Sequence, residues 1–121
     1  MADYKFSNEH AWVLVDGDTA KIGITPYAAE QLGDVVYVDL PEVGEVLTAG
    51  DTFTEVESSK TSSEVPAPIS GEILAVNDEL DDSPELVNED AFAAWIIEVK
   101  VEDDAELDLL LNEGDYSAIC D

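Results

Sequence analysis

The pattern of hydrophobic and polar residues predicts a chain built mainly from short β-strands. Residues 12–15 and 20–24 are apolar-rich runs separated by an Asp-Gly-Asp turn, which is the pattern of a β-hairpin. Apolar runs over 34–40 and 96–101 are also typical of strands. Because turn residues separate all of these runs, we expect a mainly β fold with short connections.

Three short helical segments are expected between and after these strands. Over residues 25–33, Thr25 is placed to cap a helix, Pro26 occupies its first position and Gly33 ends it. Residues 83–88 predict a turn or a short helix.

The third helix is expected near the C-terminus, over residues 103–114. Asp103 is placed to cap it, and Glu106 stands at the capping-box position. Gly114 is expected to end it. The predicted apolar face consists of Leu107, Leu110 and Leu111.

Two similar segments lie in the middle of the chain. "GEVL" begins at Gly44 and "GEIL" begins at Gly71, and Lys60 lies between them. Pro66 and Pro68 follow the lysine, which favours a hairpin or an edge strand over a central strand. We therefore expect a sandwich of two small sheets with the lysine at a hairpin tip. No linker divides residues 1–121, so a single domain is expected.

The charge of the chain restricts its partners. Thirty acidic residues stand against four lysines and no arginine, for a net charge of -26. Such a surface repels phosphate groups, so we expect neither nucleic acid nor membranes as partners, and it favours basic docking faces. Solubility, or adaptation to a salty habitat, explains the average charge equally well. Without an export signal or a long apolar segment, a cytoplasmic protein is expected. We also expect a monomer.

Conventional catalytic and metal-binding motifs are missing from the sequence. One histidine and one cysteine make no zinc-binding cluster. Thirty carboxylates form pairs by chance, and there is no phosphate-binding glycine loop or nucleophile elbow. The sequence therefore gives little support to conventional catalysis.

Lys60 is the most unusual candidate residue, because only small polar side chains surround it. An exposed amine is protonated at neutral pH and is a poor nucleophile, which argues against a role as a base or in Schiff-base formation. An acceptor for an acyl group is one interpretation. An ordinary exposed lysine is the other, and both stay open on these residues alone. The neighbours are Ser58, Ser59, Thr61, Ser62 and Ser63.

Motifs along nearly the whole chain show a family resemblance. In order, they are "EHAWV" at 9–13, "AKIGIT", "LGDVVYVDLPEVG" at 32–44, "VESSKTSSEVPAPISGEILAVNDEL" at 56–80, "PELVNED" and "WIIEV". In this order and spacing, they resemble the H proteins of the glycine cleavage system. The resemblance implies a barrel-sandwich hybrid fold, as in lipoyl and biotinyl carriers, with short flanking helices.

The same resemblance implies a cofactor and a set of partners. Lys60 would carry lipoate in amide linkage; biotin carriers have methionine on both sides of their lysine, whereas Ser59 and Thr61 stand here. The arm would carry the aminomethyl group of glycine from a pyridoxal-phosphate-dependent glycine decarboxylase to a tetrahydrofolate-dependent aminomethyltransferase. Dihydrolipoyl dehydrogenase would then reoxidise the arm. A lipoyl ligase or transferase would attach it.

A cleft for the loaded arm is also implied, because an S-aminomethyl adduct is labile in water. Matching the family motif places Glu9, His10 and Glu64 along it. The alternative is a structural role for His10 and a solvated one for Glu64.

Two departures from the family pattern bear on the cargo. Ala11 stands where the family usually has glutamate, and residues 91–94 lack the usual Pro-Tyr-Gly-like turn. Two other functions stay open, the first of which these departures would mark. One is an H-like paralogue that relays lipoyl groups or serves a redox partner, and the other is an unmodified acidic interaction module.

Overall fold

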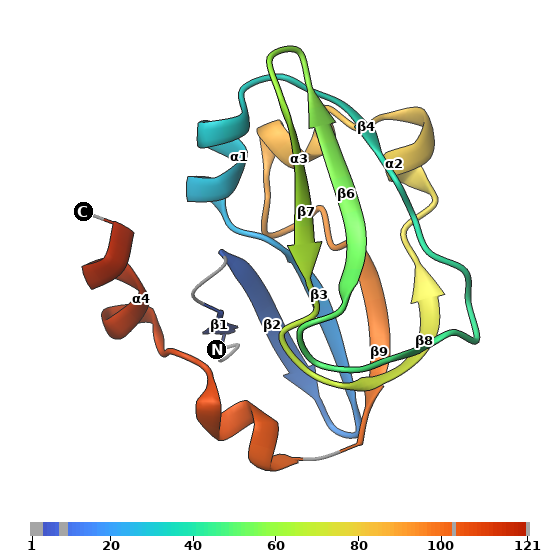
Figure 1. The fold of residues 1–121 in the computed structure, drawn as a ribbon, viewed down its shortest axis with the longest axis vertical. Coiled ribbons are helices and arrows are strands. Elements are labelled where there is room, and N and C mark those ends of the chain that lie inside the picture. Colours follow the sequence, from blue (N-terminus) through green and yellow to red (C-terminus); the bar gives the residue numbers. More distant parts are fainter. Residues whose placement is uncertain (1–3, 8–9, 103, 121) are drawn as a thin grey trace.

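Two antiparallel β-sheets lie against each other in the computed structural model, which describes residues 4–7, 10–102 and 104–120 (Figure 1). The first sheet has the strand order β1 (Tyr4–Phe6), β2 (Ala11–Asp16), β3 (Thr19–Ile24), β9 (Ile97–Val101), β8 (Gly71–Val76) and β5 (Val46–Leu47). The second has the order β4 (Val35–Val38), β6 (Thr52–Ser58) and β7 (Ser62–Pro66). The prediction of a mainly β sandwich of two sheets is confirmed.

The predicted hairpin between β2 and β3 is present. Its register runs from Ala11 opposite Ile24 to Asp16 opposite Thr19. Gly17 has φ 64° in the turn, a conformation that glycine adopts without the steric cost of a Cβ. Local turn chemistry therefore sets this part of the larger sheet.

The two similar segments, "GEVL" and "GEIL", pair with each other in the larger sheet. Leu47 lies opposite Gly71 and Val46 opposite Glu72, in antiparallel register. The Gly44 N–H also donates a hydrogen bond of 2.8 Å to the Ile73 carbonyl. The likeness of the two segments thus corresponds to an antiparallel pair within one sheet.

The main hydrophobic core lies between the two sheets, because each strand turns one face inward. The larger sheet contributes the fully buried side chains of Val13, Ile22, Ile73, Ile97 and Val99. The smaller sheet contributes Val38, Phe53, Val56 and Val65. This burial holds β6 and β7 on the larger sheet and fixes the direction in which their connecting loop projects.

The helix over residues 25–33 is confirmed as α1 (Pro26–Leu32). The Thr25 Oγ accepts a hydrogen bond of 3.2 Å from the Ala28 N–H, as an N-cap does. Gly33 follows with φ 85° and ψ -150°, a region that is almost exclusive to glycine. The segment over 83–88 contains α3 (Leu86–Glu89), and a further short helix, α2 (Glu79–Asp82), precedes it.

The prediction of one helix over residues 103–114 is wrong. The segment forms a 3-10 helix, η1 (Asp104–Leu109), and a separate helix, α4 (Glu113–Cys120), begins after it. Between them, Leu111 pairs with Phe6 through backbone hydrogen bonds of 2.8 and 2.7 Å. This pairing satisfies the exposed edge of β1, and it interrupts the helix that the leucine pattern favours. No helix of the described ranges is long and apolar enough to cross a membrane.

The expected capping residues of that helix have other positions. Gly114 lies inside α4 and does not end a helix. The Glu106 carboxylate accepts hydrogen bonds of 2.8 Å from both the N–H and the Oγ of Ser70, so it ties η1 to the segment before β8. Asp103 lies outside the described residues.

Gly71 gives a test of the strand packing. A Cβ built on Gly71 would lie 2.2 Å from the Lys100 carbonyl oxygen, so Gly71→Ala forces β8 and β9 apart. We expect the free energy of unfolding to fall by about 2 kcal/mol or more, measured by urea denaturation.

Gly114→Ala is the matched control, since its Cβ would meet only the Asn112 Oδ1 at 3.5 Å, an ordinary contact. Equal stability of the two variants would contradict the close approach of β8 and β9.

Candidate functional site

Lys60 lies exposed at the tip of the β6–β7 hairpin, at the top of Figure 1. The Ser58 N–H donates to the Thr61 carbonyl at 2.7 Å, and the Ser58 Oγ donates to the same carbonyl at 2.9 Å. That Oγ also accepts from the Thr61 N–H at 3.1 Å. The small polar neighbours of the lysine therefore form the bend that projects it.

The stem of Lys60 lies beside Gly33, at the end of α1. A Cβ on Gly33 would lie 3.3 Å from the Lys60 Cε and 3.8 Å from its Cδ. The positive φ of Gly33 is what requires glycine here, and the lysine stem lies close to the same position.

Asn88 of α3 fixes the bend that supports the hairpin tip. Its Nδ2 donates to the Gly33 carbonyl at 2.7 Å, and its Oδ1 accepts from the Val35 N–H at 2.7 Å. Between these two residues, the Asp34 carbonyl accepts a hydrogen bond of 3.0 Å from the Ser59 N–H. A continuous set of hydrogen bonds therefore joins α3, the bend after α1 and the residue before Lys60.

A groove of about 440 Å³ lies between α1 and the β7 side of the lysine hairpin, beginning directly after the tip. Its polar lining comes from two sides. His10, Tyr27 and Gln31 stand on one side, and Thr61, Ser62 and Ser63 of the hairpin stand on the other. Its apolar lining consists of Ile24, Ala28, Leu32 and Val65. This composition suits a slender, partly apolar group with a polar end.

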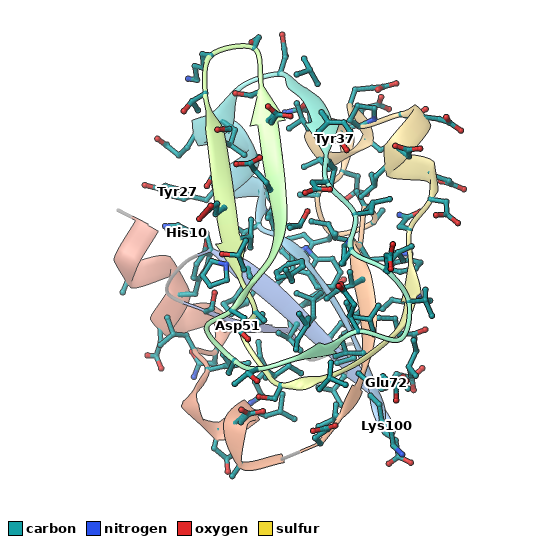
Figure 2. All side chains as sticks on the ribbon, turned by 45° about the vertical axis from the view of Figure 1, so that its right-hand side comes forward. His10, Tyr27, Tyr37, Asp51, Glu72 and Lys100 are labelled. Carbon is teal, nitrogen blue, oxygen red and sulfur yellow. The ribbon has the colours of Figure 1, made fainter. Side chains whose placement is uncertain are left out.

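The His10 ring forms a fixed part of the groove wall. It lies directly before β2, with φ 69°, and its ring centroid is 4.7 Å from that of Tyr27 (Figure 2). Its Nδ1 is hydrogen-bonded to the Tyr116 hydroxyl at 2.7 Å, and that hydroxyl is 2.6 Å from the Thr25 Oγ. Because Thr25 is completely buried, the chain of hydrogen bonds through the Tyr116 hydroxyl holds the imidazole in a fixed position.

The structure does not bring all the predicted cleft residues together. His10 lines the groove beside the lysine hairpin. Glu64 lines a different hollow of about 210 Å³, together with Asp39 and Glu55. Glu9 lies outside the described residues. The role of Glu64 in an arm cleft stays a prediction.

The two departures from the family pattern lie within packed regions. Ala11 is fully buried in the main core and does not line the groove. The Ala91 carbonyl accepts a hydrogen bond of 3.1 Å from the Trp12 Nε1, and the Phe92 ring packs on Tyr4 with centroids 4.6 Å apart. The 91–94 loop is thus tied to an aromatic cluster on the larger sheet.

Sequence reasoning missed three residues of this region: Tyr27, Asn88 and Tyr116. Tyr27 stands in the first turn of a correctly predicted helix, next to its cap, so its position could have been predicted from the sequence. The other two contact residues more than 50 positions away along the chain, and no local pattern indicates such contacts.

The comparisons with known proteins agree with one another. The family model for the glycine cleavage H-protein matches residues 4–121. A glycine cleavage system H protein of Parvibaculum lavamentivorans is 52% identical over 118 residues, which cover 97% of this chain and 94% of that protein. One of Staphylococcus epidermidis is 50% identical over 117 residues, covering 96% and 93%.

A solved structure extends this similarity to the fold. The crystal structure of a glycine cleavage system H protein from Mycobacterium marinum superposes with a TM-score of 0.84 at 37% identity. The match covers 96% of this chain and 94% of that one. The chain therefore belongs to the glycine cleavage H-protein family.

Proposed function

We propose that this chain is the lipoyl carrier of a glycine cleavage system, with lipoate in amide linkage on the Lys60 Nζ. The observation that carries the proposal is the position of this amine, exposed at a hydrogen-bonded hairpin tip. Family membership supports the cofactor and the system. An attaching enzyme, a lipoyl ligase or transferase, must bring an activated acyl donor to the amine, and an exposed tip allows this.

The residues around Lys60 hold the arm and direct it. When bound, the lipoyl group supplies disulfide chemistry, through which the aminomethyl carbon of glycine passes from the decarboxylase to the aminomethyltransferase and the arm is reoxidised by dihydrolipoyl dehydrogenase. The protein itself catalyses no step. The fixed hairpin sets the point from which the arm reaches each partner's active site, which raises its effective concentration there.

We also propose that the groove between α1 and the lysine hairpin is the cleft for the loaded arm. Thr61 and Ser63, which follow Lys60 in the sequence, line the groove. An arm on Lys60 therefore enters the groove by folding back along β7. Its apolar lining contacts methylene groups, and the His10 and Tyr27 rings close one side. A group held there is withdrawn from water.

Loss of the amine gives the first test. Lys60→Ala protein from lipoate-replete cells should keep the unmodified mass, whereas the wild-type chain should be heavier by one lipoyl group. Glycine-dependent release of carbon dioxide with the three partner enzymes should disappear in the variant. Lys100→Ala is the control and should be modified normally. Lipoylation or glycine turnover that persisted without Lys60 would refute the proposal.

The position of the arm is tested by NMR, because the chain contains a single histidine and its ring signals are unambiguous. In the loaded protein, nuclear Overhauser contacts are expected between arm methylenes and the rings of His10 and Tyr27. The Tyr37 ring is exposed on β4, outside the groove lining, and serves as the control. Contacts to Tyr37 instead would place the arm outside the groove, and contacts to Glu64 would add that residue to the cleft.

A further inference from the structure

Strand β4 contains an irregularity beside the lysine hairpin. The pairing of β4 with β6 shifts register between Val35 and Tyr37. Regular alternation would bury Tyr37 and expose Val38, but here Val36 and Tyr37 are both exposed, by 56% and 42%, while Val38 is buried. A β-bulge re-aims side chains in this way. The result is an apolar spot of two large side chains on an edge strand.

This apolar spot lies close to Lys60 in the sheet. Tyr37 pairs with Glu57 and Val35 with Ser58, so the spot is beside the residues that lead directly into the hairpin tip. Figure 2 shows Tyr37 on the upper part of the molecule, beside the lysine hairpin. A protein that engages Lys60 from this side also meets Val36 and Tyr37.

Carboxylates lie beside the spot on the outward side of the smaller sheet. Glu57 is exposed and directly opposite Tyr37. Two residues away from that pair along the chain, the Asp39 N–H donates to the Glu55 carbonyl, and Glu55 pairs with Glu64 on β7. These four side chains make the face strongly negative, so two copies of this chain repel each other there, as does any phosphate-rich surface.

We infer that this face, an apolar centre of Val36 and Tyr37 beside the four carboxylates, is the docking surface for the enzyme that acylates Lys60. The inference rests on the proposed function. The complementary partner face is an apolar recess bordered by lysine and arginine side chains. Apolar centres supply most of the affinity of such interfaces, and charged borders mainly raise the association rate.

The test measures lipoylation by a purified bacterial lipoate–protein ligase supplied with lipoate and ATP, with the carrier concentration varied. Val36→Thr combined with Tyr37→Thr keeps β-forming residues on the strand and removes the apolar centre. We expect the KM for the carrier to rise about tenfold with little change in kcat, as for loss of a docking contact. Circular dichroism and urea denaturation establish that the variant is folded.

The matched control is Val46→Thr combined with Leu74→Thr. These side chains are 67% and 40% exposed, but they belong to β5 and β8 of the other sheet. Their KM should stay within about twofold of the wild-type value. Equal KM values for the two double variants would overturn the inference and leave Lys60 as the lipoylation site.

The salt dependence of lipoylation supplies a second readout, which tests the charged part of the face. For the wild-type chain, kcat/KM should fall as NaCl rises from about 50 to about 500 mM. Neutralising Asp39, Glu55 and Glu64 to the matching amides should flatten this dependence, and an unchanged slope would overturn the charged part of the inference.

Self-association and a failure of acylation are the two remaining outcomes against the docking surface. A wild-type dimer that the Val36→Thr, Tyr37→Thr variant loses, seen by analytical ultracentrifugation, would assign the face to a second copy and overturn the inference. A wild-type chain that the ligase does not acylate at all would overturn the proposed function, and the docking inference with it.

Discussion

The two hydrogen bonds that Asn88 makes to the bend after α1 hold the lysine hairpin in place. Gly33 and Val35 are its partners, and the Asp34 carbonyl between them receives the Ser59 N–H. A two-stranded hairpin tip has few contacts of its own and is mobile by default. Here the tip is held by the Ser59–Asp34 hydrogen bond and by the pairing of Ser58 with Val35, so the amine has a defined origin while its side chain remains exposed.

The two sides of the lysine hairpin have different chemistry, and the proposed function uses each side for a different task. One side faces the groove, where the walls are aromatic, hydroxyl-bearing and partly apolar. The other side carries carboxylates and the apolar pair on β4. A carrier must both shelter its arm and present it to other proteins, and these tasks favour opposite surfaces. Placing Lys60 at the boundary lets one residue serve both.

Local chemistry made part of this structure predictable from the sequence. The hairpin over 12–24 depends on a turn and on alternation within a few residues, and α1 depends on a cap, a proline and a glycine. The hairpin tip at Lys60 was predictable because small polar residues and nearby prolines mark it. All three segments form as expected.

The remainder depends on contacts between distant parts of the chain. The leucines over 107–111 favour a helix, but the edge of β1 competes for the backbone of Leu111 and prevails. The bulge in β4 arises from pairing with β6, so alternation alone assigns Tyr37 to the wrong side. Glu64 was placed by family likeness, which does not report on which side of a strand a residue stands.

The network behind His10 draws on both ends of the polypeptide. The imidazole is supplied near the N-terminus, and the hydroxyl that anchors it is supplied by Tyr116 in α4. Phe6 and Leu111 join the same two regions through their backbones. During synthesis on the ribosome, both sheets and the lysine hairpin emerge before α4. The hydrogen-bonded support of His10 is therefore completed last, when α4 joins the N-terminal region.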